Sequence, residues 1–366
     1  MRHPRLGALF FAQKSPQFEG TFLNKRRNFH KKYSQEHSSY LHIVNFSGGK
    51  DSTYMLLQMI QRGMPIDAVL NADTGMEFPA MYDHINQVEA HLLRERGLPI
   101  IRLKPKRTFE ELMFHAIRNG KGPGYGWPGA SVRWCTGQLK VHLIQEFTRT
   151  LQNPVLYYIA FAADEAYRLD RSGGRHPSKR YPLIDWNVTG AQALAGCYEA
   201  GFTWGGLYNQ FRRVSCWCCP LQSLEELRTL KVCYPELWSD LRRLDDQAIA
   251  QFGWDNAYGR FRPHESVRML DVRFAFEQEW LLRHKTIRTK QFYTALRTRY
   301  AECAGYIGSY ALENRPEYSR TADELLRYIT DEDLAQYRIG SETRARERTP
   351  CRRSRKKVPN QKIPSR

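Results

Sequence analysis

The feature that most constrains the fold is a six-residue segment, SGGKDS, that follows the short apolar run 42–46 and precedes helically spaced apolar residues at 54–62. Paired glycines let the backbone approach a polyphosphate, and consecutive amides at a helix N-terminus point toward its oxygens. The spacing is not that of a Walker loop. The segment predicts a phosphate cradle, and the alternative is a Gly-Gly turn that binds no ligand. The cradle residues are Ser47, Gly48, Gly49, Lys50, Asp51 and Ser52.

Apolar runs and helical patterns alternate over the first half of the chain. Strands are predicted at 42–46, 68–72, 99–103 and 155–161, and helices at 54–62, 81–96, 109–117 and 139–151. Such alternation predicts an α/β fold with a doubly wound, mostly parallel sheet covered on both faces. Ligands then bind beyond the carboxyl ends of the strands.

The strand pattern fades after residue 190, where helical periodicity with many aromatic residues takes over. We therefore expect four regions: a basic disordered arm at 1–40, a nucleotide-binding α/β domain at 41–190, a cysteine-containing helical region at 191–335 and a basic disordered tail at 336–366.

Composition favours a globular, cytoplasmic protein, because hydrophobic residues make up 42% of the chain and no apolar run is long enough to cross a membrane. The formal charge is +18, but residues 1–37 hold eight Lys and Arg against two acids and residues 344–366 hold ten against one. The excess charge therefore lies mainly in the two ends. Nucleic acid bound through these basic tails is one expected partner.

Polar residues follow two of the predicted strands. Asp73 and Thr74 lie in the run 72–79 after the second strand, where an adenine or ribose could bind. Asp164 and Glu165 follow the fourth strand and precede Arg168. Acid and arginine together in a loop also form ordinary surface ion pairs, so the residue types alone leave both interpretations open.

Eight cysteines in an intracellular chain favour metal or redox sites over disulfides. Cys135 precedes the segment SCWCCP, in which Cys216 and Cys219 form a C-x-x-C pair. Converging thiolates are the normal ligands of iron–sulfur centres. Cys218, Cys197 and Cys233 are candidates for a fourth ligand, and an open three-cysteine site is an alternative. So are a zinc site, a metal-free redox pair and simple packing of the thiols.

Four motifs in order, SGGKDS, Asp73 to Pro79, Trp134 to Lys140 and Asp164-Glu165 with Arg168, make the chain similar to the phosphoadenosine phosphosulfate (PAPS) reductase family. The resemblance implies a PP-loop, HUP-like fold that binds an adenine nucleotide in the cradle. It places Asp73 and Thr74 near the nucleoside and Arg168 near an anionic group. The cysteine layout resembles that of iron–sulfur adenylylsulfate reductases, except that Trp134 stands beside Cys135 where a cysteine pair would be expected. The resemblance implies a 4Fe-4S cluster on Cys135, Cys216 and Cys219, and we take Cys218 as the fourth ligand.

Three functions are compatible with these motifs. A sulfonucleotide reductase would take PAPS or adenylylsulfate (APS) and a thioredoxin-like reductant, but needs a tail nucleophile that neither Cys303 nor Cys351 matches. An adenylating sulfurtransferase would use ATP with Mg²⁺ and a sulfur donor, acting on nucleic acid, and suits the intact loop. The third is a non-catalytic nucleotide-binding module. The expected catalytic residues are Lys50, Asp51, Asp164 and Arg168.

Overall fold

The computed structural model describes residues 40–116, 123–171, 173–256, 258–262 and 265–308. The two basic ends, including Cys351, lie outside the described residues. No helix in the described part of the chain is long and apolar enough to cross a membrane.

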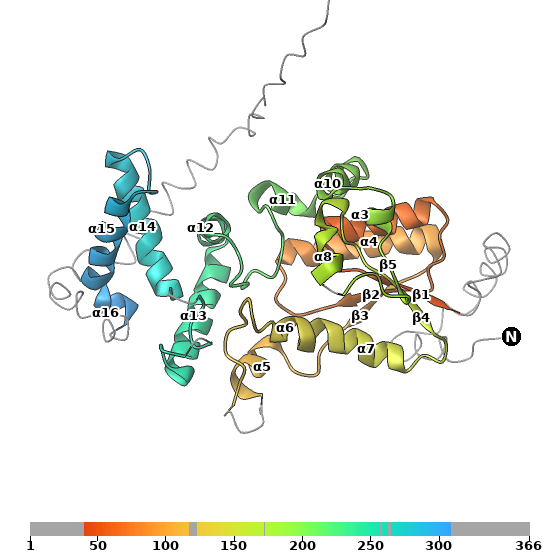
Figure 1. The fold of residues 1–366 in the computed structure, drawn as a ribbon, viewed down its shortest axis with the longest axis horizontal. Helices are drawn as coiled ribbons and strands as arrows, with labels where there is room; N and C mark the ends of the chain where they lie inside the picture. Colours follow the sequence, from red (N-terminus) through yellow and green to blue (C-terminus); the bar gives the residue numbers. More distant parts are fainter. Residues whose placement is uncertain (1–39, 117–122, 172, 257, 263–264, 309–366) are drawn as a thin grey trace, which may run out of the picture. The chain divides into compact units, whose positions relative to one another are not determined.

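A five-stranded parallel sheet forms the centre of the first half of the chain (Figure 1). Its strands lie in the order β3-β2-β1-β4-β5 and pair only in parallel. Their bounds are β1 Leu41–Asn45, β2 Ala68–Ala72, β3 Ile100–Leu103, β4 Val155–Tyr158 and β5 Lys179–Arg180. The predicted α/β fold with a doubly wound parallel sheet is confirmed. The two-residue β5 was not predicted, because so short a strand carries no periodic pattern.

Helices cover both faces of this sheet (Figure 1). On one face, α7 (His142–Arg149) contributes Ile144 and Phe147 to a core built on Ile43 and Leu70. Helices α3 (Lys50–Gln61) and α4 (Pro79–Arg96) lie on the other face. Strands β1 and β2 are almost fully buried, as expected for a parallel sheet covered on both sides.

The predicted helix at 139–151 has a different start. A π-helical segment, Gly137–Val141, follows the short helix α6 (Trp134–Thr136) and leads into α7. Hydrogen bonds in a π turn join residues five apart, a geometry that apolar spacing does not reveal.

The chain divides into two compact units. The first comprises residues 1–226 and 246–262, and the second comprises 227–245 and 263–366. The division falls within α12 (Leu224–Cys233) and α13 (Pro235–Phe252). The expected boundary at residues 190 and 191 is not the division between these units. Helix α10 (Gly190–Glu199), which begins there, belongs to the first unit with the sheet.

The remaining helices of the first unit are short, except for α10. They are α5 (Phe109–His115), α8 (Tyr167–Arg171), α9 (Pro182–Asp185) and α11 (Leu207–Gln210), with 3-10 turns at Ala163–Glu165 and Trp204–Gly206.

The second unit is helical over its described residues, with α14 (Val267–Arg283), α15 (Lys290–Glu302) and α16 (Ala304–Ile307). Phe276 of α14 packs on Phe292 and Leu296 of α15. Buried charges in this unit are paired: Lys231 binds Asp271, and Arg273 binds Glu277 at 2.9 Å. Pairing is needed because an isolated buried charge is costly.

Candidate active site

The predicted phosphate loop lies where the strand order of the sheet reverses. Strand β1 pairs with β2 on one side and with β4 on the other. Residues 47–52 follow β1, and residues 162–165 follow β4, so both segments leave the sheet at its carboxyl edge. In open α/β sheets this switch point is where ligands bind.

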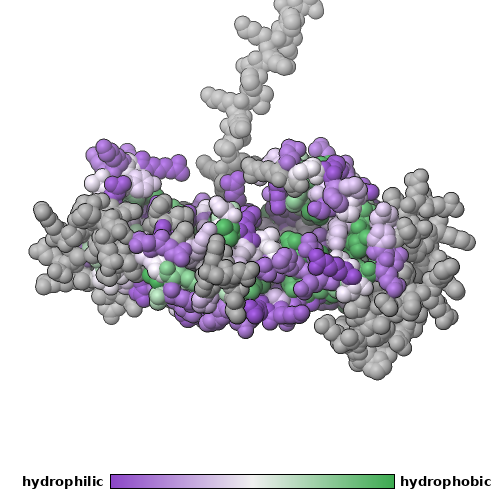
Figure 2. All heavy atoms as spheres, turned by 60° about the horizontal axis from the view of Figure 1, so that its bottom comes forward, coloured by the Kyte–Doolittle hydropathy of each residue, from purple (hydrophilic) through white to green (hydrophobic). Residues whose placement is uncertain are grey.

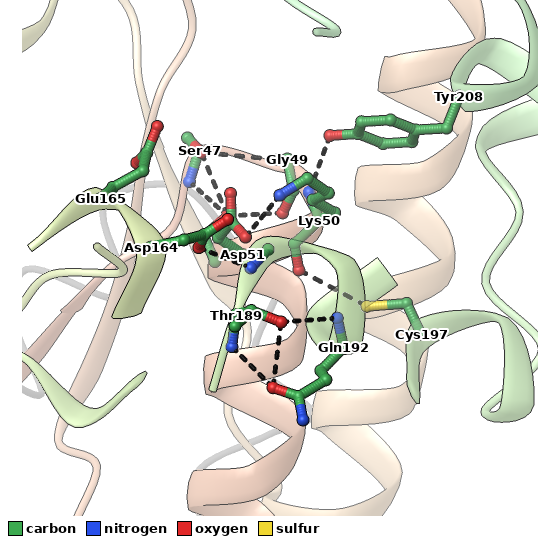
Figure 3. Close-up of polar contacts among 12 residues, drawn as sticks. Ser47, Gly49, Lys50, Asp51, Asp164, Glu165, Thr189, Gln192, Cys197 and Tyr208 are labelled. Atoms are coloured by element: carbon green, nitrogen blue, oxygen red, sulfur yellow. Dashed lines mark hydrogen bonds and ion pairs between the residues drawn. The ribbon is translucent and has the colours of Figure 1, made fainter. Parts of the chain in front are cut away.

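The loop is held by its own serines (Figure 3). The Ser47 and Ser52 hydroxyls are 3.1 Å apart, and Ser52 donates a hydrogen bond to the Gly49 carbonyl at 3.0 Å. Gly48 has φ +80°, and a Cβ built there would lie 2.8 Å from Sδ of Met81. Only glycine therefore fits this turn without strain.

The first amides of α3 are available to a ligand. Gly49 caps the helix without a side-chain hydrogen bond. The amides of Asp51 and Ser52 have no hydrogen-bond partner among the residues that the structure describes. Free amides at the positive end of a helix dipole favour a bound anion.

Charges gather directly beside these amides (Figure 3). Lys50 Nζ lies 2.7 Å from Asp51 Oδ1. Burial raises the pKa of Asp51, and the nearby carboxylates of Glu165 and Asp164 raise it further, while Lys50 acts in the opposite direction. Asp164 in turn accepts a hydrogen bond from the Gly190 amide, at the start of α10, at 2.9 Å. The structure thus brings together three of the four predicted catalytic residues.

Arg168, the fourth, lies at the rim. Its guanidinium binds Glu165 at 2.6 Å and stacks 4.0 Å above the ring of Phe161. Through Glu165 it is connected to the group around Asp51. Its side chain is 44% exposed, so it is accessible to an anionic ligand at the edge of the site.

Tyr208 and Trp204 complete the loop and were not identified from the sequence. The Lys50 amide donates to the Tyr208 hydroxyl at 2.9 Å, and Trp204 Nε1 donates to the Gly48 carbonyl at 2.7 Å. The two rings meet edge to face at 4.8 Å. Tyr208 therefore occupies one of the amide positions that a phosphate oxygen would use.

Asp73 and Thr74 follow β2 and point to different partners. Asp73 Oδ1 accepts from the Gly75 amide and from the Tyr82 hydroxyl, both at 3.0 Å. The Thr74 hydroxyl lies 3.3 Å from Glu77 Oε1 and 3.9 Å from the Cys216 sulfur. Thr74 thus lies beside Glu77 and Cys216. The position of Asp73 and Thr74 near a nucleoside stays a prediction.

Among the four predicted metal ligands, Cys218 interacts electrostatically with the other three. Cys135 extends from α6, and Cys216, Cys218 and Cys219 lie in the loop before α12. Burial raises the pKa of the Cys216 and Cys218 thiols, and the other cysteines of the group contribute to the shift. Burial also raises the pKa of Cys135, with Cys219 as the next cause. A raised pKa keeps these thiols protonated, and a bound metal would have to displace their protons.

Glu77 and Lys140 border the thiols. Cys216 donates to Glu77 Oε1 at 3.4 Å, and Lys140 Nζ lies 3.5 Å from the same oxygen. Burial lowers the pKa of Lys140, but Cys216 and Glu77 together outweigh it and raise the pKa overall. The π turn after Cys135 brings Lys140, five residues on, toward the same side of the helix. The motifs containing both residues were recognised, but neither residue was singled out.

The other two candidates for a fourth ligand are Cys197 and Cys233. The Cys197 thiol donates to the Lys50 carbonyl at 3.5 Å, at the start of α3, and burial raises its pKa to about 12. Cys233 belongs to the second compact unit. Cys218 is therefore the candidate that lies with Cys135, Cys216 and Cys219.

The thiols fit a soft metal or an iron–sulfur cluster in their chemistry, since thiolates are the usual ligands of both. The positions of these side chains, however, do not form a site for a single metal ion. Across the described ranges, no three His, Cys, Asp or Glu side chains stand where they could jointly hold a metal ion. The donor set is assembled without the geometry of a closed metal site.

The fold and loop are those of an α/β domain with a candidate anion site at the sheet switch point. Residues 42–156 match the family model of the phosphoadenosine phosphosulfate reductase domain, a family of the PP-loop superfamily, so this part of the chain is similar to that domain. The match ends before Asp164, the second unit and most of the thiols.

Two uncharacterized proteins of Methanocaldococcus jannaschii are similar to the chain. One is 26% identical over 206 residues, which is 54% of this chain and 39% of that protein. The other is 25% identical over 237 residues, or 62% of this chain and 52% of that protein. The chain thus spans between two fifths and about half of the length of these relatives.

Proposed function

We propose that this protein uses ATP, as its magnesium complex, in the loop at 47–52 and acts in sulfur chemistry as an adenylating enzyme. The observation that carries the proposal is the group of carboxylates at the loop. Asp164 Oδ1 accepts from the Gly190 amide at 2.9 Å, and a Cβ built on Gly190 would lie 3.5 Å from Asp51 Oδ1, so the two carboxylates flank the same glycine. Glu165, next to Asp164, is the third acid, and both raise the pKa of Asp51. Three acids would repel a bare phosphosulfate, whereas they suit a nucleotide that arrives with a divalent cation.

Magnesium fits this donor set. It is usually held by one or two carboxylates together with substrate phosphates, so a cage of three protein ligands is not required. Asp51 and Asp164 are the residues that would hold it. When bound, Mg²⁺ would neutralise phosphate charge. The chain's own part is to hold the phosphates: the Asp51 and Ser52 amides and Lys50 would stabilise charge on departing pyrophosphate.

The adenylation step transfers AMP to an acceptor oxygen, and pyrophosphate leaves. A sulfur nucleophile can then displace AMP from the activated acceptor. The group of thiols, with Thr74, Glu77 and Lys140 beside it, is the part of the first unit suited to supplying or positioning that sulfur. We propose that Cys135, Cys216, Cys218 and Cys219 hold an iron–sulfur cluster there.

Cys303 supports the choice of ATP over a sulfonucleotide. A reductase needs a mobile, exposed thiol to attack the sulfur. Cys303 is 2% exposed between α15 and α16, and burial raises its pKa to about 12. A buried, protonated thiol is a poor nucleophile.

Reduction of PAPS is the second candidate, favoured by the family match over residues 42–156. Calorimetry separates the two, because only ATP should depend on Mg²⁺ for tight binding. Lys50→Ala should weaken ATP binding about 10- to 100-fold, the loss of a charged hydrogen bond. Arg149→Ala, which removes an exposed charge at the end of α7, is the control. Tight PAPS binding with Mg²⁺-independent, weak ATP binding would reject the proposal.

A further inference from the structure

The connection between α14 and α15 is unusually basic. From Trp280 to Ala301 the chain has no acidic residue. Five cations in this stretch are exposed and form no ion pair with any described residue: Arg283, Lys285, Arg288, Lys290 and Arg297. These five residues and Tyr293 are called the basic surface below.

Other cations of the second unit are engaged. Arg273 is bound by Glu265 and Glu277, Lys231 by Asp271, and Arg243 by Asp240. Even Arg299, within the basic stretch, is bound to Glu279 at 2.6 Å and to Glu302 at 3.2 Å. The basic surface therefore differs from its surroundings in having uncompensated charge, which favours a polyanionic partner.

The connection is held in a defined shape. Trp280 Nε1 donates to the Thr286 carbonyl at 3.1 Å, and His284 stacks on the Trp280 ring at 3.8 Å. Ile287 packs against the core of Phe276 and Phe292. The Thr289 side chain caps α15 through the Phe292 amide. The cations are thus presented on a packed turn between two helices that lie side by side (Figure 1).

An exposed aromatic ring lies among the cations. Tyr293 is 46% exposed, and on α15 it stands three residues after Lys290 and four before Arg297, a spacing that puts all three on one helix face. Thr294 and Thr298 are also exposed. This face of α15 is polar and cationic with one exposed ring, which suits phosphates and stacked bases. The exposed Leu281 and Leu282 at the end of α14 are too few for the broad apolar face that a bilayer requires.

We propose that the basic surface binds single-stranded nucleic acid, with its cations on the backbone phosphates and Tyr293 stacking on a base. The site lies in the second unit and is independent of the proposed nucleotide reaction. It also differs from the basic ends, since it belongs to the described helices.

Fluorescence anisotropy with a labelled oligothymidylate of about 20 nucleotides tests this, using the full chain. Lys285→Gln/Lys290→Gln/Arg288→Gln should bind at least about tenfold more weakly. The slope of log K against log salt should fall by about 2, because each phosphate contact contributes about 0.7 for single strands. The control, Arg94→Gln/Arg149→Gln/Arg243→Gln, removes the same charge from three scattered exposed positions and should bind like wild type.

Tyr293→Ala should weaken binding to the single strand by about fivefold or more and leave binding to a duplex of equal length unchanged. Circular dichroism confirms that each variant is folded. Equal losses in the two triple variants would overturn the proposal, since bulk charge would then explain binding. It would also be overturned if the basic-surface triple variant lost binding to phosphatidylserine vesicles but kept the oligonucleotide.

Discussion

Tyr208 occupies a position that the proposed substrate needs. Its hydroxyl accepts the Lys50 amide hydrogen at 2.9 Å, and burial raises the pKa of the phenol, so it stays protonated. A phosphate oxygen at the same amide must displace it or share the donor. In the nucleotide-free protein, we expect this hydrogen bond to keep the Tyr208 hydroxyl on the Lys50 amide.

Tyr208→Phe should therefore tighten ATP binding by about 2- to 10-fold, because the variant no longer spends a hydrogen bond of about 0.5–1.5 kcal/mol on opening the site. Calorimetry on wild type and variant measures this difference. Tyr198→Phe serves as the control, because it removes a phenol hydroxyl whose hydrogen bond to Asn209 is long, at 3.5 Å. Weaker binding by Tyr208→Phe would mean that the hydroxyl contacts the nucleotide instead of competing with it.

The thiols carry the second prediction at this scale. Anaerobically purified protein should be brown and contain iron and acid-labile sulfide, because Cys218 interacts electrostatically with Cys135, Cys216 and Cys219, and thiolates are the normal ligands of iron–sulfur centres. Cys135→Ser should lose the colour and the iron, whereas Cys197→Ser, at the phosphate loop, should keep both. Colourless protein with stoichiometric zinc would contradict the cluster.

At the scale of elements, the turn from β1 to α3 depends on Gly48. Gly48→Ala should cost about 1–3 kcal/mol of unfolding free energy, because it forces a side chain into the left-handed region against Met81. Gly49→Ala is the matched control. Gly49 has φ −72°, and a Cβ there meets only ordinary contacts at 3.5 Å. Denaturant unfolding of both variants measures the difference, and equal costs would contradict this explanation of the turn.

His84 links three elements. Its Nε2 lies 2.9 Å from the Thr53 hydroxyl of α3, and its ring stacks on Trp204 at 4.2 Å. Burial lowers its pKa to about 3, and its Nδ1 has no partner in the described part of the chain. The folded state therefore cannot take up the proton that an unfolded histidine binds near pH 6.5.

The sign of the effect follows. Above pH 6.5 both states are neutral at this site, while between pH 6.5 and 3 only the unfolded state is protonated. As the pH is lowered from 6.5 toward 3, protonation of His84 in the unfolded state should therefore reduce the free energy of unfolding by about 1.4 kcal/mol per pH unit. Denaturant unfolding at pH 7.5 and 5.0 should show a smaller acid loss for His84→Gln than for wild type. Identical losses would show that His84 is not the responsible group.

Local pattern is enough to predict most of these elements. Strand β2 lies at Ala68–Ala72 as expected, and α4 at Pro79–Arg96 ends at the predicted residue. The proximity of residues 47–52 and 162–165 also follows, since parallel strands bring their carboxyl ends to one edge. Tyr208 could not be found this way. It is 158 residues from Lys50 along the chain, and no periodic pattern encodes that contact.

At the scale of the whole molecule, basic and acidic side chains gather in different parts of the chain. The sequence places most of the net charge of +18 in the two ends, and the structure adds the basic surface of the second unit. The first unit instead gathers acids at its phosphate loop (Figure 3). Figure 2 shows a largely hydrophilic face with small, scattered hydrophobic patches.

The central claim is that ATP, and not a sulfonucleotide, is consumed at residues 47–52. Its most direct test is turnover of the full chain with ATP and Mg²⁺ in one reaction, and with PAPS and reduced thioredoxin in another. We predict release of AMP and pyrophosphate from ATP, lost in Lys50→Ala, and no sulfite from PAPS. Thioredoxin-dependent sulfite release from PAPS, with ATP left intact, would contradict the account.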